Sequence, residues 1–289
     1  KQTEDKTDRR QNRQKTKQAH LTTGENNTNK GGAEMNCPRK NRKSSMRTPD
    51  KQRFFDAVNH VQRPDVAFWE MEADIDLINR IMGWDEPLSM HSFEMVPEKV
   101  VEWTRTYGCD MAFFGYVWHL GRKEFSAEAG RVHYVDGEIK DRDALAEKYY
   151  EHDLGETRRK LEALLEVMDR SGETFGLVVG AQTTGFTTAT AIGYETFCLQ
   201  TILDPQFITD FQQRVHEFTM RELEMVLEYP QVDAVKFSSG LVSNNGPMIS
   251  PAMMQEFEYR WLREQMAAVK AAGRKIIFHI DGNVSGELP

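Results

Sequence analysis

Short runs of apolar residues recur along the chain, separated by longer segments in which apolar residues follow a helical spacing. Most of the runs are nearly continuous in apolar character, which is typical of strands that are buried on both faces of a sheet. Five of them stand out, namely residues 65–71, 110–116, 175–181, 233–239 and 275–281. We expect each of these runs to form a β-strand.

The segments between the runs carry helix start and stop signals. Thr48–Pro49, Asp204–Pro205 and Ser250–Pro251 each join a side chain that can cap a helix to a proline that suits the first helical position. Gly172 and Gly273 close two helical patterns, as glycine often does just past a helix end. The chain therefore alternates predicted strands with predicted helices.

This alternation predicts βαβ units and a parallel sheet, either doubly wound or closed into a barrel. No GxGxxG motif follows the first strand, which disfavours a dinucleotide-binding Rossmann fold. Five units of about 50 residues each account for the folded part, whereas a complete barrel has eight units. The pattern therefore fits either a doubly wound sheet or a (β/α)8 barrel that is truncated after its fifth β-strand.

Charge divides the chain into two parts. Residues 1–50 contain 13 Lys and Arg against 6 Asp and Glu, a balance of +7, and the other 239 residues contain 24 against 39, a balance of −15. The first part has almost no aliphatic or aromatic residues, so we predict a disordered basic tail over residues 1–47 and a barrel domain over residues 48–289. Acidic and amide residues dilute the basic ones, which disfavours nucleic-acid binding.

The sequence also bears on the compartment. It contains no run of 18 apolar residues, so we predict no membrane span. Its three cysteines, Cys37, Cys109 and Cys198, are far apart and odd in number, which disfavours a disulfide framework. We therefore expect a reducing compartment and a cytoplasmic location.

Polar and aromatic residues gather where the predicted strands end, and in both architectures that edge of the sheet holds the active site. They are Trp69, Glu70 and Glu72; Gly115, Tyr116, Trp118 and His119; Gln182, Thr183 and Thr184; Ser238, Ser239 and Asn244; and His279, Asp281 and Asn283. Any one of them could simply cap a helix or bind loop backbone. Together they indicate a pocket for a small-molecule substrate. The substrate-binding residues that we predict are Glu70, Tyr116, His119, Gln182, Ser239 and Asn283.

His279 and Asp281 form the most specific pair among these residues. They lie two positions apart in the last apolar run, so in a strand both side chains point to the same face. The spacing leaves three interpretations open: a buried pair that orients a loop, half of a metal site, or an acid/base pair. Zinc at His279 would need further ligands, because zinc takes at least three from a protein.

Several ordered segments resemble the uroporphyrinogen decarboxylase superfamily. The opening TPDKQRFFDAVNHVQRPDVAFWE, the segment GAQTTGFTTATAIGYETF and the stretch from Val232 to Asn283 are similar to its first, third, and fourth and fifth units. The last stretch includes the Ser-Pro helix start and the HxxGN strand end. The resemblance covers residues 47–289 and implies a (β/α)8 barrel. The fold that we predict is therefore an α/β (β/α)8 TIM barrel, truncated after its fifth β-strand.

Two chemistries are implied by this resemblance. The decarboxylases remove carboxyl groups from the acetate side chains of a tetrapyrrole without a cofactor, and use arginines after the first strand and an aspartate after the second. The methyltransferases move a methyl group between a corrinoid and a thiol or a folate. Those with thiol acceptors hold zinc with a His-x-Cys pair on the fifth strand and a later cysteine.

The chain departs from both patterns. Acids in FWEMEADIDLINR replace the arginines, Gly115–Tyr116 replaces the aspartate, and Asp281 stands where the cysteine would pair with His279. An acidic rim would repel a polycarboxylate, whose binding calls for fixed cationic donors. We therefore favour a corrinoid-linked methyltransferase with His279 and Asp281 as catalytic residues. Zinc at His279 is the weaker alternative, because a carboxylate is a harder ligand than a thiolate.

The corrinoid would be a substrate or be carried by a partner protein, because the chain contains no DxHxxG cobalamin loop. Uroporphyrinogen decarboxylation, a step of porphyrin biosynthesis, is the second hypothesis. The third is an incomplete barrel without catalysis, whose open sheet edges would favour aggregation.

Overall fold

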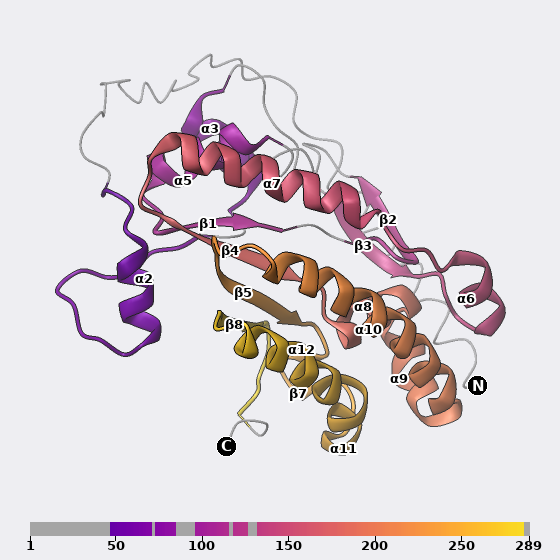
Figure 1. Ribbon diagram of the computed structural model, residues 1–289. Coiled ribbons are helices and arrows are strands. Elements are labelled where there is room, and N and C mark those ends of the chain that lie inside the picture. The colour runs from indigo at the N-terminus through magenta and orange to yellow at the C-terminus, as the bar shows by residue number, and fades with distance from the viewer. Residues whose placement is uncertain (1–46, 71–72, 85–95, 116–117, 127–131, 286–289) are drawn as a thin grey trace, which may run out of the picture. The chain divides into compact units, whose positions relative to one another are not determined.

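The computed structural model describes residues 47–70, 73–84, 96–115, 118–126 and 132–285 of the chain (Figure 1). The predicted basic tail lies outside these ranges apart from its last residue, so the tail stays a prediction. Within these ranges, no helix is both long enough and apolar enough to cross a membrane.

Four parallel strands form the central sheet, and they match four of the predicted strands. They are β1 (Met111–Phe114), β4 (Gly176–Ala181), β5 (Val232–Ser239) and β8 (Lys275–Ile280), in that spatial order (Figure 1). Order across the sheet is thus order along the chain. A doubly wound sheet reverses at a switch point, whereas barrel strands are added on one side. The structure therefore shows an α/β fold with a parallel central sheet of four strands, which is consistent with a partial TIM-like barrel, and the described residues contain no closed barrel.

The predicted first strand, residues 65–71, is not a strand in the part that the structure describes. Residues 66–70 have no regular secondary structure. The amide of Asp110 donates a hydrogen bond to the carbonyl oxygen of Phe68 over 2.7 Å. The amide of Phe68, however, donates to the side chain of Asp110 over 2.9 Å. Because a carboxylate replaces the backbone partner of a ladder, this segment lies against the start of β1 without joining the sheet.

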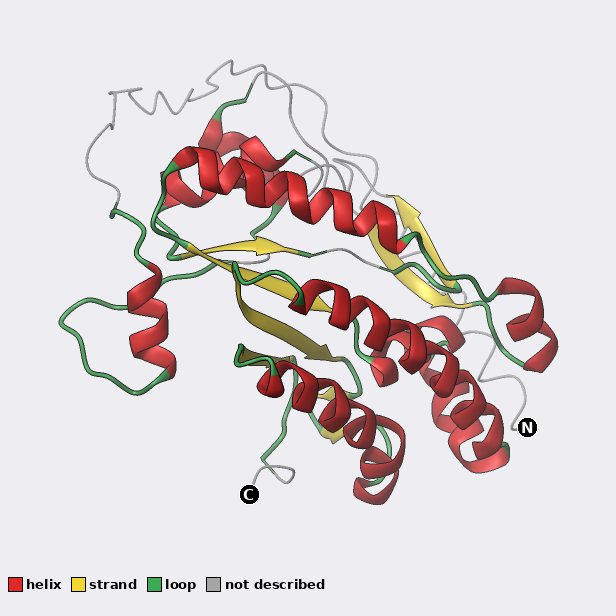
Figure 2. Ribbon diagram, in the orientation of Figure 1, coloured by secondary structure: helices red, strands yellow, loops and turns green. Residues whose placement is uncertain are grey.

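Helices follow the strands, and two pairs of short antiparallel strands accompany them (Figure 2). The helices are α2 (Lys51–Val58), α3 (Ile75–Met82), α5 (Pro97–Tyr107), α6 (Arg142–Lys148), α7 (Leu154–Ser171), α8 (Thr184–Ile192), α9 (Tyr194–Leu203), α10 (Pro205–Leu227), α11 (Pro251–Met254), the π-helical turn η2 (Gln255–Tyr259) and α12 (Arg260–Ala271). The short strands are β2 (Arg122–Ser126) with β3 (Val132–Gly137), and β6 (Val242–Ser243) with β7 (Gly246–Pro247). The sequence pattern predicted neither pair of short strands nor the π-helical turn.

Most of the predicted helix boundaries are confirmed. The Asp204 side chain accepts a hydrogen bond from the amide three residues later over 3.0 Å, and Ser250 does the same over 3.3 Å. Gly172 and Gly273 have φ angles of 66° and 73°, which glycine adopts without strain. Asp204 and Ser250 therefore begin helices by capping them, and the two glycines end helices by adopting a positive φ.

The first helix begins two residues later than its Thr48–Pro49 signal predicts. Helix α2 starts at Lys51, and its cap is Asp50, whose side chain accepts a hydrogen bond from the amide of Gln52 over 2.9 Å. An aspartate caps a helix as well as a threonine does. Thr48 and Asp50, on either side of Pro49, are therefore both possible caps, and the sequence does not decide between them.

The sheet has two faces with different partners. Its outer face packs against α5, α7, α10 and α12 and forms the larger apolar core, which includes Phe114, Leu177, Val235 and Phe237. Its inner face is the opposite one. There Met111, Val178 and Ala234 form a smaller buried cluster with Phe54, and Phe113, Trp69 and Ile277 pack against this cluster.

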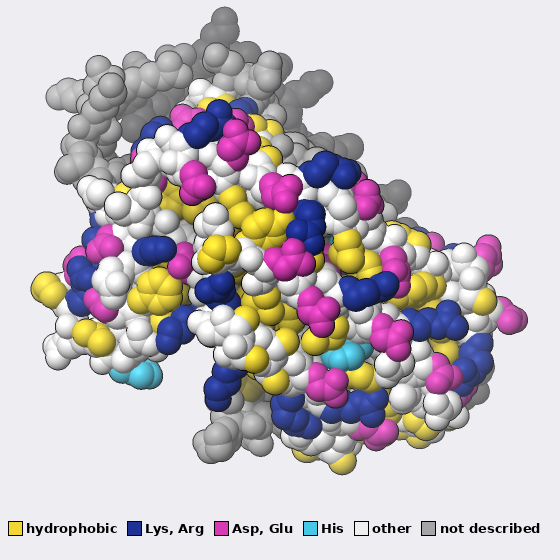
Figure 3. Space-filling model, in the orientation of Figure 1, with side chains coloured by type: hydrophobic (Ala, Val, Ile, Leu, Met, Phe, Trp, Pro, Cys, Tyr) yellow, Lys and Arg dark blue, Asp and Glu magenta, His cyan; other side chains and the backbone are white. Residues whose placement is uncertain are grey.

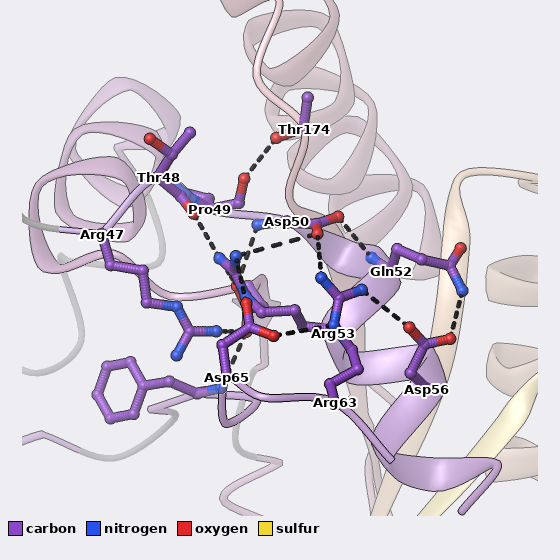
Figure 4. A network of polar contacts seen from close by, with 12 residues as sticks. Arg47, Thr48, Pro49, Asp50, Gln52, Arg53, Asp56, Arg63, Asp65 and Thr174 are labelled. Carbon is purple, nitrogen blue, oxygen red and sulfur yellow. Dashed lines mark hydrogen bonds and ion pairs between the residues drawn. The ribbon is translucent and has the colours of Figure 1, made fainter. Parts of the chain in front are cut away.

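A network of charges holds residues 47–68 to the amino end of β1 (Figure 4). Its centre is Asp110, which is fully buried. The Asp110 carboxylate accepts hydrogen bonds from the guanidinium groups of Arg47 and Arg53 and from the amides of Asp50 and Phe68. Every oxygen of this buried anion is therefore paired, as burial of a charge requires. Because function lies at the other end of a barrel, we interpret the network as structural.

The surface mixes both signs of charge. Acidic and basic side chains are interspersed over the face that Figure 3 shows, with no extended patch of one sign. Many of them are paired with each other, for example Arg142 with Asp210 over 2.7 Å and Arg158 with Glu228 over 2.7 Å. Such exposed pairs contribute little to stability.

Candidate functional site

Alternation along the strands decides which residues at the carboxyl end of the sheet face inward. Ala234 and Ile277 belong to the inner face, so Lys236, Ser238 and His279, at steps of two, belong to it as well. Ser238 and His279 are direct neighbours in the register of β5 and β8. This set is called the inner tip below. It brings the predicted His279 together with Ser238, which is one of the predicted strand-end residues, and with Lys236, which was not predicted.

His279 and Asp281 form a pair, as their spacing predicted. Nε2 of His279 lies 3.3 Å from Oδ1 of Asp281, and the two side chains are 32% and 87% exposed. A half-exposed imidazole beside an exposed carboxylate can reach a ligand, unlike a buried structural pair. The geometry therefore leaves the pair available for acid/base work.

Asn283 serves the loop that follows β8. Its side-chain oxygen accepts hydrogen bonds from the amide and the hydroxyl group of Ser285, over 3.1 and 2.6 Å. Its amide donates to the carbonyl oxygen of Ser243 over 2.9 Å. The loop is thus fixed to β6, which holds Asp281 near the inner tip.

Lys236 is the residue of the inner tip that the sequence reasoning missed. Its side chain is 6% exposed, and its Nζ lies 6.0 Å from the centroid of the Phe113 ring. Gly180, its neighbour in the register, leaves room for that ring, because a Cβ there would lie 3.0 Å from Cζ of Phe113. A lysine inside the otherwise apolar run DAVKF was the signal that could have identified it.

His119 and Gln182 follow β1 and β4, as predicted. Nδ1 of His119 lies 2.8 Å from Oε2 of Glu124, and Arg122 also binds this carboxylate, over 2.9 Å. The carbonyl oxygen of Gln182 accepts a hydrogen bond from Nε2 of Gln265 over 2.8 Å. His119 is therefore coupled to β2, and Gln182 to α12.

Glu70 lies at a different place from the other predicted residues. Its backbone lies against the thiol of Cys109, two residues before β1, and burial raises the pKa of that thiol to about 11. Glu70 is therefore near the amino end of β1. Tyr116, the remaining predicted substrate-binding residue, and Glu72 lie outside the described residues.

Ser239 points away from the inner tip. It belongs to the outer face, is 5% exposed, and lies beside the carboxyl group of Glu258 in the turn η2. Sequence reasoning did not single out Glu258. Its place on the buried stripe of its helix, four residues after Met254 and three before Trp261, was the available signal.

A metal site at the inner tip would have two protein ligands in the structure. His279 and Asp281 could bind one ion, but in the described part of the chain no three His, Cys, Asp or Glu side chains come together around a common point. The donor set described here does not fit zinc, which takes at least three protein ligands. We therefore derive no step through a metal.

The geometry defines an α/β protein with a sequentially ordered parallel sheet and a polar, partly exposed tip at its carboxyl end. No protein-family model and no curated protein matches the sequence. Among solved structures, the chain is similar to a methyltransferase from Methanosarcina mazei, with a TM-score of 0.59 and 15% sequence identity. The similarity covers 82% of this chain and 71% of that chain. At this identity the likeness concerns the fold.

Proposed function

We propose that the protein is a methyltransferase that moves a methyl group between a corrinoid and a small acceptor at the inner tip. The observation that carries the proposal is the exposed His279–Asp281 pair at the carboxyl end of a sheet whose fold is similar to that of a methyltransferase. In such folds the carboxyl ends of the strands hold the active site. The corrinoid is a substrate here, free or presented by a partner protein.

The roles of the two residues follow from the chemistry. A methyl group that leaves a corrinoid as a cation equivalent leaves its bonding electron pair on the donor, and the acceptor loses a proton when it is methylated. His279 is placed to take that proton, and Asp281 orients the imidazole. A softer metal ligand is not required where the acceptor is not a thiol.

The test is methyl transfer from methylcobalamin to a panel of thiol and folate acceptors, followed anaerobically by the absorbance change of the corrinoid. General acid–base groups contribute roughly 100-fold or more to a rate, so we expect His279→Ala to lose about 100-fold. We expect Asp281→Asn to lose about 10-fold, because it keeps the shape but not the charge of the orienting group.

His60→Asn is the matched control. His60 is exposed in the loop after α2, with a φ of 58°, and asparagine tolerates this backbone conformation. We expect its rate to equal that of the wild type. Transfer that His279→Ala leaves unchanged would contradict the role of the pair. Formation of coproporphyrinogen from uroporphyrinogen, without methyl transfer, would replace the proposal with decarboxylation.

A further inference from the structure

Glu258 is a buried acid whose carboxyl group makes no hydrogen bond of normal geometry within the part of the chain that the structure describes. The residue is 1% exposed, and both carboxyl oxygens are buried and unpaired. The Ser239 hydroxyl group is also buried and lies close enough to lower the pKa of this carboxyl group, but the two groups do not meet in the normal geometry of a hydrogen bond. Such orphaned groups are rare in native proteins, and each one calls for an explanation.

The carboxyl group lies where three elements meet at the carboxyl end of the sheet. A Cβ at Gly185 would lie 1.5 Å from Oε2 of Glu258, so the carboxyl group fills the space of the missing side chain in the first turn of α8. Ser239 brings the end of β5 to the same point. One residue before α8, the Thr183 hydroxyl group donates to the carbonyl oxygen of Ser238 over 2.8 Å. Glu258 itself lies in a π-helical turn, a feature that is frequent at functional sites.

Among the described residues, no cation compensates a negative charge at this point. Helices α8 and α11 carry no ionisable side chain, and α10 presents the amide of Gln212, which binds the carbonyl oxygen of Phe257 over 2.6 Å. Next to that amide, burial lowers the pKa of His216. In α12, Arg260 lies over the Trp261 ring at 3.9 Å.

Three further ionisable groups near this point are one phenol and two carboxyl groups. Burial raises the pKa of Tyr194 in α9 to about 12, so this phenol is neutral. Glu264 in α12 binds His216 over 3.0 Å. In η2 itself, Glu256 is exposed to solvent. Burial therefore outweighs the Ser239 hydroxyl group, which lowers the pKa of Glu258, and raises the pKa of this carboxyl group to about 7.

We propose that Glu258 is a proton-dependent positioning residue: as a neutral acid it holds the end of β5 against α8, and its ionisation loosens the inner tip. Ser239 touches this group, and the adjacent Ser238 is the register neighbour of His279. A displaced β5 end therefore displaces His279. The inference concerns the tip that the proposed function uses, but its test does not require the reaction.

The test is amide hydrogen exchange of the full chain between pH 5.5 and 8.5, with each rate divided by the intrinsic rate at that pH. In the wild type, we expect protection at residues 237–240 and 279–281 to fall about 10-fold as Glu258 ionises. In Glu258→Gln, which keeps the shape and stays neutral, we expect the protection to be constant.

Glu256→Gln is the matched control, because it removes an exposed acid two residues away in the same turn. It should behave as the wild type does. Infrared difference spectra of the wild type against Glu258→Gln at pH 5.5 should show the carbonyl band of a protonated acid. Absence of that band, or protection of the wild type that is constant with pH, would overturn the inference. In that case the amino end of α8 stabilises an ionised Glu258.

Discussion

Two buried carboxyl groups lie at opposite ends of the sheet, and the groups that surround them differ. Asp110 is paired with two guanidinium groups and two amides, whereas Glu258 has no cationic partner among the described residues and only the Ser239 hydroxyl group beside it. A paired carboxylate can remain charged inside a protein, and an unpaired one is forced toward its neutral form. At the scale of single residues, the amino end of the sheet therefore holds a fixed charge network, whereas the carboxyl end holds a carboxyl group that can change its protonation state.

Asp110→Asn should be strongly destabilising. The substitution removes the negative charge that pairs with Arg47 and Arg53, and breaking a buried ion pair costs about 3 kcal/mol or more. Asp65→Asn is the control, because Asp65 binds the same Arg53 over 3.2 Å but is 41% exposed. We expect it to cost less than about 1 kcal/mol. Urea denaturation of the two variants gives the comparison, and equal costs would contradict the structural role of Asp110.

Sequence reasoning reached some of these residues and not others. The spacing of His279 and Asp281 was enough to place them together, because side chains in a strand repeat every two residues. The same rule puts Ser239 on the opposite face from Ser238, which polarity alone does not reveal. Lys236 was missed because it stands as a single charge in an otherwise apolar run. Glu258 was missed because it stands among other charged residues of its helix, where a charge usually belongs to the solvent-exposed face.

At the scale of elements, local chemistry fixes the helix ends. Helix α10 begins where Asp204 caps it, and the glycines after α7 and α12 close those helices. These boundaries could be predicted because a cap depends on residues that are close in sequence. The π-helical turn η2 could not, because it depends on how Glu258 and its neighbours pack against α8.

The contribution of the Asp204 cap to stability can be measured separately from that of the ion pair between Asp204 and Arg142. Asp204 and Asp210 both bind Arg142, and both are 43% exposed, but Asp204 alone also accepts the amide bond that caps the helix. We expect Asp204→Ala to lower the free energy of unfolding by about 1 kcal/mol more than Asp210→Ala does. Urea denaturation of both variants measures the difference. No difference would mean that the cap contributes nothing beyond the ion pair.

At the scale of the whole molecule, stability should depend on pH through Glu258. The pKa of this group rises from 4.5 to about 7 on folding. Between these values the folded chain keeps a proton that the unfolded chain releases, so the contribution to stability is complete below pH 4.5 and is lost as pH rises to 7. The loss is about 3 kcal/mol, because one pKa unit corresponds to about 1.4 kcal/mol.

The measurement is the difference in unfolding free energy between the wild type and Glu258→Gln in urea at pH 5, 6, 7 and 8. His216 acts in the opposite sense, because its lowered pKa costs stability as pH falls below 6.5, but it is common to both proteins. The wild type should lose stability relative to the variant up to pH 7 and not above. A difference that is the same at every pH would contradict the prediction.

The alternation of strands and helices was sufficient to predict a parallel sheet, its strand positions and its α/β class. It was insufficient for the segment around Phe68, where the side chain of Asp110 takes the place of a backbone partner. It also cannot decide between an open sheet and a closed barrel, because closure depends on contacts between strands that are far apart in sequence.

The one-directional order of the sheet has a consequence for synthesis. Each new strand is added beside the one made before it, so no strand has to be inserted between two that have already paired. A ribosome releases a chain from its amino end, at roughly 5–20 residues per second. The sheet can therefore grow at a single edge in the order of translation, with each βα unit docking on a finished template.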